Sequence, residues 1–174
     1  IVVMAGGKGK RMKNLTKDTP KPLLKTKNKP ILEHIFNNIK KNNYKKIYVT
    51  TKYQSTKIRN FINIYSKKNN IAIREIKEKK FLGTAGCLKN LKEKIPGKLI
   101  LVNGDVITNL NYVDLLNHHE LYKNDITICS KEDNFKVPYG LIKKNKNNNF
   151  FIDEKPNFIL RFNIGIYVIN PNTI

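Results

Sequence analysis

Several features that mark particular classes of protein are scarce in this sequence. Its 174 residues hold two cysteines, Cys87 and Cys129, no tryptophan, and four arginines among 34 basic residues. Two cysteines without a CxxC spacing exclude a cysteine-based zinc site and favour reduced thiols. No apolar run approaches the roughly 20 residues that span a bilayer, and the first one leads directly into glycine and charge, unlike a signal peptide. We therefore expect a cytoplasmic protein with no membrane partner.

Positive charge is abundant but not concentrated. The formal net charge is +21, which on its own suggests nucleic-acid binding. The lysines are spread along the whole chain, whereas a nucleic-acid surface usually clusters its cations and interleaves aromatic side chains. We interpret the excess as drift in an AT-rich coding sequence that also favours solubility, and predict no nucleic-acid partner. The alternative, nucleic-acid binding, predicts an affinity that falls steeply with salt.

Strand-like and helix-like segments alternate along the first half of the chain. Strands are predicted at 1–4, 46–51, 71–76 and 98–102, and helices at 30–39, 58–65 and 83–91. This alternation predicts an α/β fold, a Rossmann-like three-layer α/β/α sandwich with a mostly parallel central sheet. A helix at 111–121 and strands at 125–130, 139–143, 150–154 and 163–169 follow, with a hairpin tip at 143–149. We expect a single domain over residues 1–174 that is truncated at both ends.

A glycine-rich loop follows the first predicted strand. Gly6, Gly7 and Gly9 let backbone N–H groups turn inward to form an anion-binding nest, and Arg11 and Lys21 add positive charge. The spacing fits neither a dinucleotide fingerprint nor a Walker A loop, and an ordinary turn would also explain the glycines. Prolines on both sides of Lys21 restrict the chain around that lysine. The pattern favours a loop that holds the phosphates of a nucleoside triphosphate.

Three further places carry polar side chains that could serve a reaction. Asp105 follows an apolar strand, where it could be a turn residue or a ligand of Mg²⁺ together with substrate phosphates. Gly83 and Thr84 open either a plain helix or a surface against which a flat base can lie. Glu154 and Lys155 offer a carboxylate for hydroxyl groups and an ammonium for a phosphate, or a simple ion pair at a strand end. Ligands of parallel sheets sit beyond the carboxyl ends of the strands, where the glycine loop and Asp105 both fall.

Read in order, these stretches resemble the sugar-1-phosphate nucleotidyltransferases. The matching segments are MAGGKGKRMKNLTKDTPKPLL, KPILEHI, FLGTAGCL, LVNGDVIT, VPYGLI, IDEKP and FNIGIYVINP, and they span nearly the whole chain in the order of the family. The sequence looks most similar to bacterial hexose- or aminohexose-1-phosphate guanylyltransferases of surface-glycan or legionaminic acid pathways. The resemblance implies that a sugar-1-phosphate attacks the α-phosphorus of a nucleoside triphosphate, with GTP slightly favoured, and that pyrophosphate leaves in a Mg²⁺-dependent reaction.

The resemblance also implies a role for particular residues. The implied catalytic residues are Arg11, Lys21 and Asp105, the last of which would hold Mg²⁺. The implied nucleotide-binding residues are Ala5, Gly6, Gly7, Gly9, Arg11, Gly83 and Thr84. The implied sugar-phosphate-binding residues are Gly140, Glu154, Lys155 and Asn163. No general base is needed, because the attacking phosphate is already ionised, and all three histidines are interpreted as structural.

Some positions depart from the family pattern. Lys10 and Asn14 stand where the family usually has threonine and proline, and Ile164 replaces a small residue beside Asn163. The second metal-binding aspartate of the family is expected beyond residue 174, so we expect these 174 residues alone to turn over poorly. A non-catalytic regulatory subunit that binds nucleotide sugars is the alternative function. The base, the sugar and the oligomeric state, a homo-oligomer included, stay open.

Overall fold

The computed structural model describes residues 1–9, 12, 15–78 and 97–173. Its internal contacts divide the chain into two compact units, one made of Ile1–Ile128 with Gly165–Ile174 and the other of Cys129–Ile164. The helix predicted at 83–91 lies outside the described residues. Within the described part, no helix is both long and apolar enough to cross a membrane.

The first unit is built on a mostly parallel sheet. Its core strands are β1 (Val2–Met4), β4 (Lys46–Thr51), β5 (Ala72–Lys77) and β6 (Leu99–Asn103). The sheet order is β5-β4-β1-β6-β10-β7, with β7 at Ile126–Lys136 and β10 at Asn157–Ile169. β1, β4, β5 and β6 pair in parallel, and β10 runs antiparallel to β6. The predicted α/β fold with its mostly parallel central sheet is confirmed.

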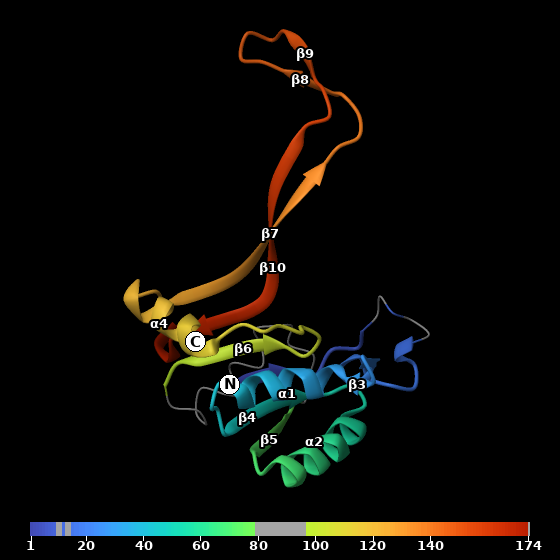
Figure 1. Cartoon of the computed structure of the whole chain (residues 1–174), viewed down its shortest axis with the longest axis vertical. Helices are drawn as coiled ribbons and strands as arrows, with labels where there is room; N and C mark the ends of the chain where they lie inside the picture. The colour runs from blue at the N-terminus through green and yellow to red at the C-terminus, as the bar shows by residue number, and fades with distance from the viewer. Residues whose placement is uncertain (10–11, 13–14, 79–96, 174) are drawn as a thin grey trace. The chain divides into compact units, whose positions relative to one another are not determined.

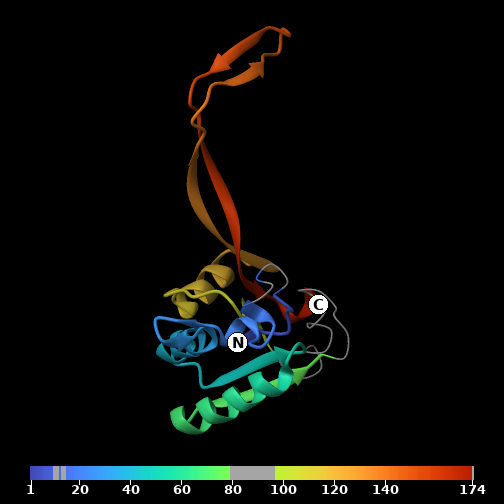
Figure 2. The ribbon, with the colours of Figure 1, turned by 90° about the vertical axis from the view of Figure 1, so that its right-hand side faces the viewer.

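Within the described residues, three α-helices accompany this sheet. α1 (Ile31–Lys41) begins directly after Pro30, whose fixed φ suits a helix start, and α2 (Ser55–Asn69) packs against β5. α4 (Tyr112–Leu121) is capped by Asn111, whose side chain accepts from two backbone N–H groups of the first turn. Figures 1 and 2 show α2 alongside β4 and β5.

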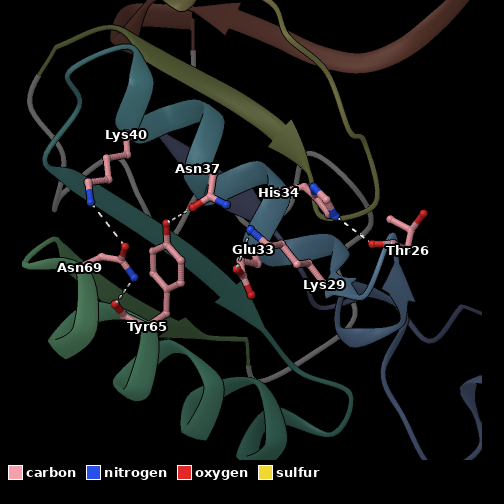
Figure 3. A network of polar contacts seen from close by, with 8 residues as sticks. All are labelled: Thr26, Lys29, Glu33, His34, Asn37, Lys40, Tyr65 and Asn69. Carbon is pink, nitrogen blue, oxygen red and sulfur yellow. Dashed lines mark hydrogen bonds and ion pairs between the residues drawn. The ribbon is translucent and has the colours of Figure 1, made fainter.

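The α1–α2 interface combines an apolar core with a polar rim. Phe36 and Tyr65 place their ring centroids 5.1 Å apart, and the Tyr65 hydroxyl donates to Asn37 Oδ1 over 2.7 Å (Figure 3). Burial, with a smaller effect from the charge of Glu33, raises the pKa of Tyr65 to about 12, so this donor stays protonated at neutral pH. Each fully buried large apolar side chain contributes about 1.5–3 kcal/mol, so this packing holds α2 against α1.

The core of the first unit contains the apolar residues whose spacing predicted the helices and strands. Four α1 residues that recur at helical spacing are buried, namely Leu32, Ile35, Phe36 and Ile39. The strands β1, β4 and β6 are buried almost along their whole length, as expected for a sheet covered on both faces. His119 is also buried, and its ring nitrogens bond Thr127 Oγ1 and Asn170 Oδ1. This pairing agrees with a structural role for that histidine.

The second unit consists of strand segments and turns. The hairpin of β8 (Leu141–Lys144) and β9 (Phe150–Asp153) is antiparallel, with the predicted tip between them. The strands predicted at 125–130 and 163–169 are longer than expected, because β7 continues to Lys136 and β10 begins at Asn157. Both extensions are mostly exposed: 131–136 is mostly polar, and 157–162 is mostly apolar but does not alternate with polar residues, so neither carries the pattern on which the prediction relied. Cys129 in this unit is a free thiol, and Cys87 lies outside the described residues.

Candidate active site

The strand register of the first unit brings several loops to one edge of the sheet. Met4 at the end of β1 lies opposite Thr50 in β4 and opposite Asn103 in β6. Thr51 at the end of β4 lies opposite Lys77 at the end of β5. The four parallel strands therefore end level with one another. Whatever follows each of them in the sequence is placed along a common carboxyl edge, the usual ligand edge of such sheets.

The glycine loop begins at this edge and turns as its sequence requires. Ala5 stays bonded to the sheet, because its amide donates to the carbonyl of Thr50 over 2.9 Å. Gly9 adopts a φ of 61°, a left-handed conformation that glycine reaches without steric cost. A Cβ at Gly9 would lie 3.0 Å from Thr16 Cγ2, so this turn has little room for a side chain. Gly7 is exposed, and nothing lies within 4 Å of where its Cβ would be.

Lys21 and Asp105, 84 positions apart in the sequence, are in direct contact. Lys21 opens a 3-10 turn, Lys21–Leu23, with a proline on each side as the sequence suggested. Its ammonium donates to Asp105 Oδ2, and both side chains are 34% exposed. Asp105 follows β6, and the amide of Gly104 before it donates to the Met4 carbonyl over 2.8 Å. The contact places a cation and a carboxylate together, open to solvent, at the end of the sheet.

Glu78 is a third charged residue at this edge, and sequence reasoning did not single it out. It follows β5, and its amide donates to the carbonyl of Thr51 over 2.9 Å. Only 9% of the residue is exposed, and its Oε1 lies 3.2 Å from where a Cβ of Gly6 would be. No hydrogen bond or ion pair joins its carboxylate to another residue within the described part of the chain. A buried carboxylate without such a partner is an acceptor available to a ligand.

A separate ion pair supports the strand ends beside the loop. Arg59 Nε and Thr51 Oγ1 each donate to a different oxygen of Glu75, over 2.5 Å in both cases. Burial alone would raise the pKa of Glu75, but the hydrogen bonds from Arg59 and Thr51 and the nearby positive charges hold this pKa below its usual value. Glu75 is therefore fully ionised at neutral pH and links α2 to β4 and β5.

The second unit contains the residues implied for the sugar phosphate. Gly140 precedes β8 and Glu154 follows β9, and a Cβ on Gly140 would lie 2.8 Å from Glu154 Oε2. Lys155 adopts a left-handed φ of 47° directly after Glu154, and its side chain is exposed. Asn163 lies in β10 and is exposed as well. Gly140 and Glu154, at least, are neighbours in space, while the roles of all four stay predictions.

Three implied residues cannot be located. Arg11, Gly83 and Thr84 lie outside the described residues, so the structure describes neither the loop arginine nor the predicted base surface. Of the implied charged residues Arg11, Lys21, Asp105 and Lys155, the structure brings one pair into contact. Lys21 and Asp105 meet in the first unit, and Lys155 belongs to the second unit.

The residues at this edge suit a divalent cation shared with a substrate. Within the described ranges, no three histidine, cysteine or acidic side chains gather in a group that could hold a metal by themselves. Mg²⁺ commonly binds through only one or two carboxylates and completes its shell with water and substrate phosphates. Asp105 is accessible, and its Oδ1 is left over by the bond from Lys21 to Oδ2. One such carboxylate fits a metal that arrives with a phosphate substrate.

The fold and this edge define an α/β protein whose candidate site lies beyond the carboxyl ends of parallel strands. Over residues 1–174 the chain matches the family model described as nucleotidyl transferase, and it belongs to that family. The resemblance read from its motifs is thereby confirmed.

Similar proteins agree with this membership. A mannose-1-phosphate guanyltransferase of Hypocrea jecorina is 31% identical over 182 residues, which are 99% of this chain and 50% of that protein. HddC from Yersinia pseudotuberculosis has a solved structure with a TM-score of 0.77 and 27% identity, covering 99% of this chain and 77% of HddC. A second HddC structure, in complex with GMP-PN, has a TM-score of 0.76 and 25% identity over the same shares. The chain spans about half the length of the guanyltransferase it matches.

Proposed function

We propose that this chain is the catalytic part of a sugar-1-phosphate nucleotidyltransferase that prefers GTP. A phosphate oxygen of the sugar-1-phosphate forms a bond to the α-phosphorus, the bond from that phosphorus to the β-phosphate oxygen breaks, and pyrophosphate leaves. The observation that carries the proposal is the contact between Lys21 and Asp105 beside the glycine loop, in a member of the nucleotidyl transferase family. The names of the similar proteins support the same reaction class.

Electrostatics explains why this chemistry requires such an edge. Two polyanions must come within bonding distance, and each pair of unit charges at 4 Å repels by about 4 kcal/mol at an effective dielectric of 20. Lys21 places one full positive charge beside the loop, and the backbone N–H groups of the glycine loop add partial charges. Because the attacking phosphate is already ionised, positioning and neutralisation account for most of the catalysis.

The proposed roles follow from where each group lies. Asp105 would hold the divalent cation, which would supply further positive charge to the phosphates. Lys21, limited by its flanking prolines, orients the reacting phosphates, and Arg11 is assigned to the triphosphate by family resemblance. In the second unit, the Glu154 carboxylate accepts from sugar hydroxyl groups, and Lys155 binds the sugar phosphate.

Glu78 supports the preference for GTP. A carboxylate is a two-oxygen acceptor, and guanine presents two adjacent donors, its N1–H and its 2-amino group, whereas uracil and thymine present a single ring N–H. An acceptor without a described partner favours the base that supplies both donors, since a hydrogen bond to a charged group contributes about 1.5–3 kcal/mol. The complex of HddC with GMP-PN is consistent with a guanine nucleotide in this fold.

The proposal is tested by pyrophosphate release from the complete gene product. The four common ribonucleoside triphosphates and dTTP are crossed with mannose-, glucose- and glucosamine-1-phosphate, with each substrate omitted in turn. We expect release only when both substrates are present, fastest with GTP, and lost in Asp105→Asn. Tight nucleotide binding without release for any sugar phosphate would instead identify the regulatory subunit considered from the sequence.

The base preference is tested at Glu78. Inosine triphosphate lacks the 2-amino group, so the wild type is expected to prefer GTP over ITP by about tenfold or more, the value of one charged hydrogen bond. Glu78→Gln is expected to bring the two nucleotides within about threefold, at similar stability. A GTP-to-ITP ratio that Glu78→Gln leaves unchanged would remove Glu78 from base recognition without touching the reaction class.

A further inference from the structure

The turn between β4 and α2 bonds the segment that leads from the glycine loop to Lys21. The Tyr53 hydroxyl donates to the backbone carbonyl of Thr16 over 3.2 Å and approaches that of Lys17 to 3.4 Å. Gln54 Nε2 donates to the same Lys17 carbonyl over 2.8 Å and to the Tyr53 hydroxyl over 3.1 Å. One helical turn later, the ammonium of Lys57 donates to the carbonyl of residue 18.

Three consecutive carbonyl groups are thus bound by side chains from one short stretch. We call Tyr53, Gln54 and Lys57 the carbonyl clamp. All three donate to backbone, so the clamp recognises the path of the segment 16–18 rather than its side chains. Exposed loop carbonyls are ordinarily satisfied by water, and a set of aligned side-chain donors fixes one backbone conformation instead.

The clamp also connects with the beginning of the glycine loop. The amide of Tyr53 lies 3.4 Å from the carbonyl of Gly6, at the start of the loop, and donates to it. Tyr53 and Gln54 of this turn therefore bond the loop at Gly6, before Gly7, and again after residue 15. Gln54 holds a left-handed φ of 47°, which non-glycine residues rarely adopt and which persists only where surrounding contacts support it. That conformation directs the Gln54 amide group to the carbonyl of Lys17.

The clamped segment in turn determines where Lys21 lies. Thr16 is buried, and its hydroxyl donates to the carbonyl of Gly9 over 3.3 Å, so it joins the segment to the glycine turn. Only Asp18 and Thr19 separate the Lys17 carbonyl from Pro20 and the 3-10 turn that Lys21 opens. The chain between the clamp and Lys21 is therefore too short and too constrained to move independently.

We infer that Tyr53 and Gln54 are positioning residues, which preset the glycine loop for the triphosphate and hold Lys21 at Asp105. They touch the backbone of the loop and not the reacting atoms. This inference rests on the proposed function. It adds that the turn between β4 and α2 sets the geometry of the glycine loop. Loss of either donor loosens the loop, so the nucleotide must order the loop on binding. The affinity for the nucleotide then falls by the free energy that this ordering costs.

The test compares two tyrosines that each lose one hydroxyl. Tyr53→Phe removes the clamp donor, and Tyr65→Phe removes the matched bond to Asn37 in the α1–α2 interface (Figure 3). In the complete gene product, Tyr53→Phe is expected to raise KM for the nucleotide about threefold to tenfold, the effect of one net hydrogen bond, and to lower kcat. KM for the sugar phosphate stays within twofold of wild type. Tyr65→Phe is expected to lower thermal stability without changing either KM.

A second variant separates positioning from folding. Gln54→Gly keeps the left-handed turn at no steric cost but removes the amide donor, so stability is expected to match that of wild type while KM for the nucleotide rises. Equal nucleotide KM values in Tyr53→Phe, Gln54→Gly and wild type would overturn the inference, even if all three enzymes are active. If the wild type binds nucleotide but does not turn over, the proposed function fails. The nucleotide dissociation constants of the same variants then still test whether the carbonyl clamp positions the loop.

Discussion

Replacing Lys21 with methionine should strengthen metal binding while it weakens catalysis. In the free protein the Lys21 ammonium occupies Asp105 Oδ2 and repels any second cation near that carboxylate. A divalent ion bound through the remaining oxygen, Oδ1, would lie beside this ammonium and be repelled by it. Lys21→Met removes both the competitor and its charge, so the two effects act in the same direction.

The magnitude follows from the exposure of the pair. Coulomb's law with an effective dielectric of 20 gives about 4 kcal/mol for unit charges 4 Å apart, but both side chains are 34% exposed, so solvent screening lowers the net coupling to about 1 kcal/mol or less. That coupling corresponds to Mn²⁺ binding that is tighter by up to about fivefold. Binding of nucleotide triphosphate should weaken in the same variant, because its cation is lost.

The assay is Mn²⁺ titration followed by electron paramagnetic resonance, without nucleotide. Lys98→Met is the matched control, because Lys98 also pairs with a carboxylate, that of Glu120, and precedes β6, whereas Asp105 follows it. Both variants lose one charge, yet only Lys21→Met should gain Mn²⁺ affinity. Equal Mn²⁺ affinities in the two variants, or a weaker one in Lys21→Met, would refute the assignment of Asp105 as the metal ligand.

Three further predictions concern stability and the sugar. The pKa of Glu75 in the folded protein lies below its ordinary value of 4.5, so the ionised carboxylate stabilises the fold above pH 4.5. This stabilisation is lost as the pH falls through the lower folded pKa. The difference in melting temperature between wild type and Glu75→Gln should therefore vanish in acid. Gly9→Ala should destabilise the protein by about 1–2 kcal/mol in urea unfolding, because alanine disfavours the left-handed turn beside Thr16; an unchanged midpoint contradicts this. Gly140→Ala should raise KM for the sugar phosphate severalfold and leave that for the nucleotide unchanged, because its Cβ displaces the Glu154 carboxylate; a change in the nucleotide KM alone contradicts the assignment.

The sequence alone predicted the helices and strands in which buried residues follow a regular pattern. An apolar pattern reports burial directly, so the positions of α1 and β4 were predictable within a residue or two. In α1 the pattern is the helical spacing of Leu32, Ile35, Phe36 and Ile39, and in β4 it is an apolar run. β7 and β10 extend beyond their predicted ranges into exposed stretches, one mostly polar (131–136) and one apolar without the alternation of a half-buried strand (157–162), and local patterns do not define either as a strand. Such extensions depend on pairing between distant segments.

The same limit applies to the candidate site. Lys21 and Asp105 could be proposed because each follows a recognisable pattern, prolines in one case and an apolar strand in the other. Glu78 stands in the charged run EIKEKK, which reads as a solvated surface, yet in the fold it is buried and lies against Gly6 of the glycine loop. Tyr53 and Gln54 lie in a short connection between a strand and a helix, and no motif marks them. Side chains that donate to backbone carbonyl groups leave no recognisable pattern in the sequence.

The fate of the α-phosphate tests the central claim most directly. [α-³²P]GTP and a sugar-1-phosphate are incubated with the complete gene product and Mg²⁺, and the labelled products are separated. Transfer through the Lys21–Asp105 edge predicts that the label appears in a nucleotide sugar, and that Asp105→Asn lowers this transfer by about 100-fold or more. Label that stays in GTP, or transfer that Asp105→Asn leaves intact, would contradict the account.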